Sequence, residues 1–161
     1  MEKKIESEIE FSRVSFNVTP PEVRAAQMGL IILETDLTIE SEMHLFLSSN
    51  LRDARNEFSP PLTILHTRIP CSDNVCPETL SNMERHFSTA LNLFPNDHRF
   101  DVIGYGCTSA ALVIGEKRIQ EIVKSNINTS AVTTPLTATK VALKELAAKK
   151  QCELIDRISK N

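Results

Sequence analysis

The chain has 161 residues, 41% of them hydrophobic and 24% charged, which is the composition of one ordinary globular domain. Its formal net charge of −3, its 5% aromatic content and its lack of tryptophan give no reason to expect nucleic acid or an anionic membrane as a partner. No apolar run approaches the length that spans a bilayer, and the charged N-terminal segment lacks the apolar core of a signal peptide.

Short apolar runs alternate with longer segments of helical periodicity along the middle of the chain. Residues 1–24 are charged and polar and end near Pro20-Pro21, so we expect a tail there, and a second tail at 151–161. Residues 25–150 form the expected domain. Its predicted elements, in chain order, are strand 28–33, helix 39–50, strand 62–67, helix 77–94, strand 102–105, helix 109–124, strand 128–134 and helix 135–150.

Local residue types support these elements. Residues 28–33 are continuously apolar, as in a strand that is buried on both faces. Thr134 and Pro135 are a favoured pair for the N-cap and first position of a helix, and Pro77 suits a first helical turn. The apolar residues of the helix at 77–94 recur at steps of three and four, which places them on one face: Leu80, Met83, Phe87, Leu91 and Phe94.

The alternation of strands and helices predicts a parallel sheet with helices on both faces, a three-layer α/β fold. In folds of this kind, ligands bind beyond the carboxyl ends of the strands. This rule brings three predicted loops together, at residues 34–38, 106–109 and 133–134. A site is therefore expected where these loops meet.

The segment 100–115, FDVIGYGCTSAALVIG, predicts a buried strand, a sharp turn and the start of a helix, with Cys107 at the turn. The chain has only four glycines, and two of them, Gly104 and Gly106, stand just before this cysteine. Glycine tolerates a positive φ and lets another group approach the backbone closely. A thiol at a helix N-terminus is stabilised as the thiolate. The alternative, that Cys107 is a small buried hydrophobic residue, stays open.

Two hydroxyl residues, Thr108 and Ser109, follow the cysteine directly. The free N–H groups of a first helical turn can hold a carboxylate, and hydroxyl side chains add donors or caps. One turn thus combines a nucleophile or proton donor with a set of groups that bind an anion.

The other cysteines carry weaker signals. Cys71 and Cys76, with His66 nearby, suggest a metal, but their spacing is loose and no second pair of ligands follows. We therefore expect no metal site and no structural zinc. We interpret Cys152 as an incidental thiol of the C-terminal tail. Since the four cysteines form no tight framework, the expected location is the reducing cytoplasm.

Three segments match known motifs in order: MGLIILETDLTIESEM at 28–43, DVIGYGCTS at 101–109 and AVTTPLTATKVAL at 131–143. They resemble the maleate cis–trans isomerases and arylmalonate decarboxylases of the aspartate/glutamate racemase superfamily. The resemblance covers roughly residues 28–148. It implies one flavodoxin-like half of a pseudo-symmetric enzyme that uses neither a metal nor an organic cofactor.

In these relatives, two α/β halves face each other, and each usually supplies a cysteine across a small mono- or dicarboxylate. The resemblance implies that Cys107 is the first cysteine, which acts as nucleophile or acid/base in an isomerisation, racemisation or decarboxylation. It implies further that Thr108 and Ser109 hold the carboxylate or enediolate, assisted by Thr133 and Thr134.

Two departures from the pattern matter. Asp36 stands where many isomerase-type relatives have Asn, and an ionised Asp only accepts hydrogen bonds. Asp36 would then bind an amine or act as a base, or would be a plain helix N-cap; both interpretations stay open. The second half of these enzymes, which carries the second cysteine motif, has no counterpart in this sequence. Cys152 does not fit the second cysteine motif.

We therefore expect a fragment, a truncated product or a half-length protein that borrows a second half, and a poor enzyme when alone. The alternative function is a non-catalytic carboxylate-binding or oligomerisation domain, and another rival is a redox-sensing thiol protein. An exposed half-site also predicts self-association, most simply as a two-fold dimer.

Overall fold

The computed structural model describes residues 15–19, 24–53 and 62–146. Its four strands are β1 (Ala26–Leu33), β2 (Leu62–Ile69), β3 (Phe100–Tyr105) and β4 (Thr129–Thr133). Its helices are α1 (Ile39–Asp53), α2 (Pro77–Asn82), the 3-10 turn η1 (Met83–His86), α3 (Phe87–Leu91), α4 (Thr108–Ile114), α5 (Glu116–Asn126) and α6 (Pro135–Glu145).

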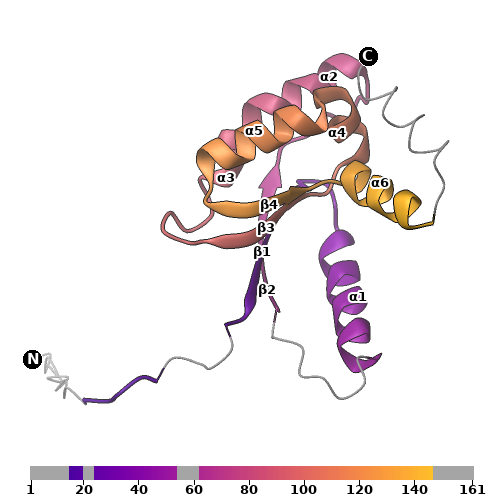
Figure 1. The fold of residues 1–161 in the computed structure, drawn as a ribbon. Helices are drawn as coiled ribbons and strands as arrows, with labels where there is room; N and C mark the ends of the chain where they lie inside the picture. Colours follow the sequence, from indigo (N-terminus) through magenta and orange to yellow (C-terminus); the bar gives the residue numbers. More distant parts are fainter. Residues whose placement is uncertain (1–14, 20–23, 54–61, 147–161) are drawn as a thin grey trace, which may run out of the picture.

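The strands form one parallel sheet in the order β2-β1-β3-β4. The apolar strand β1 lies inside the sheet, where it pairs with β2 along its whole length and with β3 through Met28–Ile31. Figure 1 shows α2, α3 and α5 over one face of the sheet and α1 and α6 on the opposite side. The predicted three-layer α/β fold is therefore confirmed.

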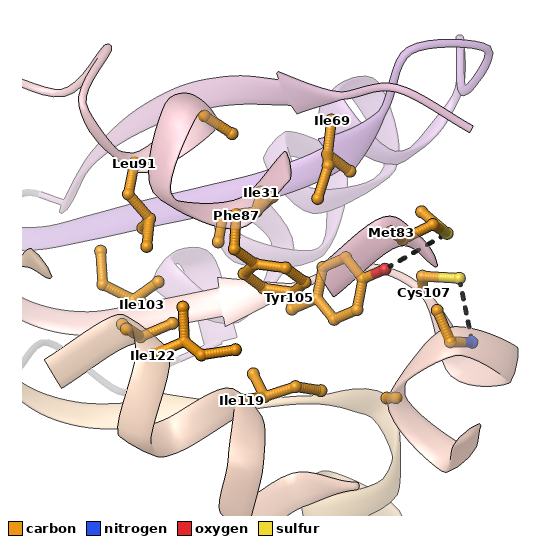
Figure 2. Close-up of a cluster of buried hydrophobic side chains, with 14 of the residues drawn as sticks. Ile31, Ile69, Met83, Phe87, Leu91, Ile103, Tyr105, Cys107, Ile119 and Ile122 are labelled. Atoms are coloured by element: carbon orange, nitrogen blue, oxygen red, sulfur yellow. Dashed lines mark hydrogen bonds between the residues drawn. The ribbon is translucent and has the colours of Figure 1, made fainter. Parts of the chain in front are cut away.

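The core lies between the sheet and the helices α3 and α5. Phe87 of α3 and Tyr105 of β3 are almost completely buried and meet edge to face, with ring centroids 4.8 Å apart. Figure 2 shows these two rings among the aliphatic side chains of both layers. Burying one such side chain contributes roughly 1.5–3 kcal/mol, so this cluster anchors the end of β3 that leads to Cys107.

Two predicted helices are interrupted in the structure. The helix expected at 77–94 is split by the tighter turn η1, which keeps Met83 and Phe87 facing the core. The helix expected at 109–124 breaks at Gly115, whose φ of 91° belongs to the left-handed region that favours glycine. Apolar periodicity did not reveal these breaks because the buried face continues across them.

Gly106 is required for close packing. A Cβ on Gly106 would lie 2.7 Å from Cδ1 of Ile39, and its N–H donates to the Ile31 carbonyl at 2.8 Å. Likewise, a Cβ on Gly104 would lie 2.9 Å from Cδ1 of Leu30. Among the described glycines only Gly115 has a positive φ, so the two glycines before Cys107 serve close approach alone.

Several sequence predictions concern the ends of the chain. Residues 15–19 contain no helix or strand, while Cys152, the tail at 151–161 and the end of the last predicted helix lie outside the described residues. The domain boundaries thus stay a prediction. Of the described helices, none is long and apolar enough to cross a membrane. Within the described ranges, no three His, Cys, Asp or Glu side chains are grouped as metal ligands would be.

Candidate functional site

A cavity of about 400 Å³ lies beyond the carboxyl ends of β1, β2 and β3. It is bounded by the segments that follow these three strands and by α2 and η1. This is the sheet edge at which the sequence predicts a ligand. Its lining residues are Leu33, Thr35, Cys71, Ser72, Asp73, Asn74, Val75, Thr79, Leu80, Met83, Cys107 and Ser109.

Cys107 stands at the strand-to-helix turn that the sequence predicts. It is the N-cap of α4, with an extended backbone and 7% exposure. Its Sγ accepts a hydrogen bond from the Ala110 N–H at 3.5 Å, which Figure 2 shows as a dashed line. An N–H group that points at sulfur stabilises a thiolate more than a neutral thiol. The thiol therefore lines the cavity at the first turn of α4.

Tyr105 is a buried neighbour of Cys107 to which the sequence analysis assigned no role, and it is not among the lining residues of the cavity. It is 1% exposed, and its hydroxyl donates to Sδ of Met83 at 3.8 Å (Figure 2). Burial raises the pKa of Tyr105 far above its ordinary value, and the neighbouring thiols of Cys107 and Cys71 raise it further. The phenol therefore stays neutral beside the two sulfur atoms. The sequence offered one signal for this role, the position of Tyr105 two residues before Cys107 at the end of the predicted strand.

Cys71 is the second thiol of the cavity. Its Sγ lies 3.3 Å from Oγ1 of Thr35, and its backbone N–H donates to the Glu34 carboxylate at 2.9 Å. The sequence places Cys71 only in a loop, because nothing in its spacing connects it with Cys107. The sheet order brings the two cysteines to one cavity.

The loop after β1 is held by Arg68 of β2. The Arg68 guanidinium donates to the carbonyls of Leu33, Glu34 and Asp36 at 3.1, 3.2 and 2.7 Å. It also pairs with the Glu40 carboxylate at 3.2 Å. These bonds fix the segment that presents Thr35 to the cavity.

The two hydroxyl residues after Cys107 have different positions. Ser109 lines the cavity, whereas Thr108 is exposed at the start of α4 and is not among the lining residues. A carboxylate-binding role of Thr108 therefore rests on its backbone position rather than on its side chain.

Asp36 lies beside the cavity and caps α1. Its carboxylate accepts hydrogen bonds from the N–H groups of Thr38 at 2.9 Å and Ile39 at 3.0 Å. These bonds, the one from Ile39 first, lower the pKa of Asp36 below its ordinary value. Since Asp36 is not among the lining residues, this geometry favours the capping interpretation.

Thr133 and Thr134 stand at the carboxyl end of β4, away from the cavity lining. Thr134 is 4% exposed, and its Oγ1 accepts the Thr137 N–H at 3.2 Å as the N-cap of α6. Oγ1 of Thr133 lies 3.0 Å from Oγ1 of Thr137, beside a separate hollow along α6. The predicted cap at Thr134 is confirmed, and the hydroxyl of Thr133 is bonded to the hydroxyl of Thr137 in the same helical turn.

Replacing Asp36 by alanine is expected to lower the free energy of unfolding by about 1 kcal/mol, because α1 loses its cap. Replacing it by asparagine keeps an acceptor and should cost less. The folded state favours the carboxylate, so the stabilisation is present above the ordinary pKa of 3.8 and is lost as the pH falls through the lowered pKa. Urea unfolding at pH 7 and below pH 4 measures this, and a larger loss with asparagine than with alanine would contradict a capping role.

No family model and no curated protein matches the sequence. Among solved structures, the maleate isomerase Iso from Pseudomonas putida S16 matches with a TM-score of 0.60 at 22% identity, over 77% of this chain and 50% of that chain. A cysteine-to-alanine variant of Iso, solved with maleate, matches with a TM-score of 0.59 at the same identity and coverage.

The Nocardia farcinica maleate cis–trans isomerase, bound to TRIS, matches with a TM-score of 0.61 at 22% identity, over 76% of this chain and 49% of that chain. The chain thus spans about half the length of these structures. At this identity the likeness concerns the fold. The chain is therefore similar in fold to one half of a maleate cis–trans isomerase, as its sequence motifs predict.

Proposed function

We propose that this chain is a maleate-isomerase-like enzyme, or half of one, that acts on a small carboxylate through the thiolate of Cys107. The observation that carries the proposal is the cavity itself, in which the Cys107 thiol shares the lining with the hydroxyl groups of Thr35, Ser72 and Ser109. The fold likeness to maleate isomerases supports it. Isomerisation, racemisation and decarboxylation are all redox-neutral, so their electron balance requires no redox cofactor.

The chemistry follows from the residues around sulfur. The Ala110 N–H stabilises negative charge on Cys107, and the buried phenol of Tyr105 stays protonated beside it. Hydroxyl donors of the lining offer hydrogen bonds to a carboxylate or to the enediolate that forms from it. Donors placed at a developing oxyanion typically contribute about a hundredfold or more to the rate.

The charge of the lining restricts the substrate. Asp73 is the one charged side chain among the described lining residues, and no described Lys, Arg or His lines the cavity. A second carboxylate would meet the exposed Asp73 without a compensating cation, which is unfavourable although solvent weakens the repulsion. The lining therefore favours a monocarboxylate or a zwitterion over a dicarboxylate.

A second candidate function is an oligomerisation domain. Val141 and Leu146, on and just beyond α6, are 60% and 77% exposed, and Val141 borders the apolar hollow beside Thr133. Large exposed apolar side chains at one helix often mark an interaction face. This function requires neither turnover nor a reactive thiol.

The proposal is tested with the full chain in D2O and a panel of maleate, α-amino acids and substituted malonates. Proton NMR follows isomerisation, exchange of the α-proton and loss of carbon dioxide, while mass spectrometry maps iodoacetamide on each cysteine. Because the chain spans only half of its structural relatives, we expect slow turnover of at least one panel member, which should also slow alkylation of Cys107. Self-association by light scattering, with neither turnover nor protection of Cys107, would instead support the oligomerisation domain.

A further inference from the structure

We propose that protonation of His66 releases α1 from β2 and thereby loosens the wall of the cavity that carries Thr35. The basis is a cluster of polar side chains between α1 and the edge strand β2, formed by Glu40, His44, His66 and Arg68. Release of α1 requires no turnover, so it is independent of the proposed function.

His66 lies on the face of β2 that α1 covers. Strand alternation directs Thr67 to the opposite face, where its hydroxyl donates to the Ala90 carbonyl of α3 at 2.8 Å. The side chain of His66 is 19% exposed, and its Nδ1 lies 3.8 Å from the Glu40 carboxylate. The ring of His44, also on α1, lies at a centroid distance of 6.3 Å. Two side chains of α1 thus cover the imidazole.

The geometry of this contact suits a neutral imidazole. A protonated imidazole donates hydrogen bonds from both of its nitrogens. Glu40 lies near Nδ1 of His66, whereas Nε2 is buried and has no hydrogen-bond partner among the described residues. A buried donor without an acceptor is unfavourable. When α1 moves away, water reaches Nε2, so protonation favours the released helix.

The charges around His66 act mainly in the same direction. Burial is the largest cause that lowers the pKa of His66 below its ordinary value of 6.5, and Glu40 opposes it. His44 on α1 and Arg68 on β2 lower this pKa further, while the β1 residue paired with His66 is the apolar Leu30. The closed contact therefore binds fewer protons than the released one. It weakens as the pH falls below 6.5 and through the lowered pKa.

α1 is held loosely enough for one protonation to matter. None of its side chains at residues 39–47 is fully buried, in contrast to side chains of α3 and α5. Segments with few buried apolar contacts open at a low free energy. The Asp36 cap is not lost in the same pH window, because hydrogen bonds lower the pKa of Asp36 below 3.8.

Arg68 connects α1 with the cavity. Its guanidinium pairs with Glu40 of α1 and donates to three carbonyls of the loop that leads into this helix. That loop presents Thr35, whose Oγ1 lies 3.3 Å from Sγ of Cys71. Release of α1 removes Glu40 from Arg68 and moves the end of the loop. Acidification should therefore increase the access of solvent to Cys71.

Hydrogen exchange followed by mass spectrometry tests the release on the full chain. Exchange of the α1 peptides, divided by the chemical exchange rate at each pH, should rise by about threefold or more between about pH 8 and about pH 5. In His66→Gln, which cannot be protonated, it should stay level over this range. Peptides of α5, whose inner face is buried, serve as the internal reference. No rise in the unaltered chain, or an equal rise in His66→Gln, would overturn the proposal.

His98→Gln is the matched control. Nε2 of His98 lies 3.1 Å from Oε1 of Gln27, before β3 and at the amino end of the sheet, so this variant should keep the full response of α1. A response that disappears in His98→Gln and remains in His66→Gln would assign the switch to the wrong histidine and overturn the proposal.

Two further measurements cover the case in which His66→Gln itself opens α1. Proton NMR of the imidazole C2 protons in the unaltered chain should give His66 a midpoint below 6.5, and a midpoint at or above 6.5 would overturn the proposal. Alkylation of Cys71 relative to Cys76 should rise on acidification in the unaltered chain more than in His66→Gln. Release of α1 without this rise would overturn the link to the cavity.

Discussion

Replacing Cys107 by serine is expected to lower turnover of the carboxylate by about 10²–10⁴-fold while the fold is kept. Serine is a favoured N-cap and can accept from the Ala110 N–H as the thiol does, so α4 retains its cap. The hydroxyl is a far weaker acid than the thiol and supplies almost no anion at neutral pH. The loss should therefore appear in kcat, measured beside circular dichroism and thermal unfolding.

Cys76→Ser is the matched control for this variant. Cys76 is also the N-cap of a helix, α2, but it is not among the residues that line the cavity. The control should keep nearly full turnover, because it changes the same atoms at the same kind of position without touching the site. If Cys107→Ser kept more than a tenth of the activity, or if both variants lost activity alike, Cys107 would not be the nucleophile or acid/base.

Replacing Phe87 by alanine is expected to lower the free energy of unfolding by about 3–5 kcal/mol. Phe87 is 0% exposed and packs edge to face on Tyr105, so alanine leaves a cavity in the middle of the core. Such a loss is a large part of the stability of an ordinary domain. It should also loosen Tyr105 and thereby speed the alkylation of Cys107, because this thiol is 7% exposed and packing restricts access to it. Urea unfolding and mapped alkylation measure the two effects.

Leu93→Ala provides the control for this core variant. Leu93 follows α3 closely in sequence but is 73% exposed, so its truncation should change stability by no more than about 0.5 kcal/mol. Similar losses in the two variants would show that Phe87 packs no more tightly than a surface residue and would contradict the core described above.

The sequence by itself determined the features that depend on neighbouring residues. The apolar run of β1, the helical spacing around Phe87 and the cap at Thr134 are local patterns, and each predicted element has a counterpart in the described structure. The turn at Cys107 was predictable for the same reason, because a buried strand followed by small and hydroxyl residues specifies where the helix begins. Alternation of these elements then implied the parallel sheet.

Only the tertiary structure decided which of these residues share a site. Cys71 meets the cavity of Cys107 because β1 separates their strands, an order that no local pattern contains. Asp36 and Thr134 cap helices at the carboxyl edge of the sheet, and Thr133 beside them bonds to Thr137. None of the three is among the residues that line the cavity. The physical reason is that these side chains form hydrogen bonds to groups only a few residues away along the chain. Those local hydrogen bonds compete with any hydrogen bond from the same side chains to a ligand. The edge of the sheet was therefore predictable from the sequence, whereas the residues that line its cavity depend on strand order and packing.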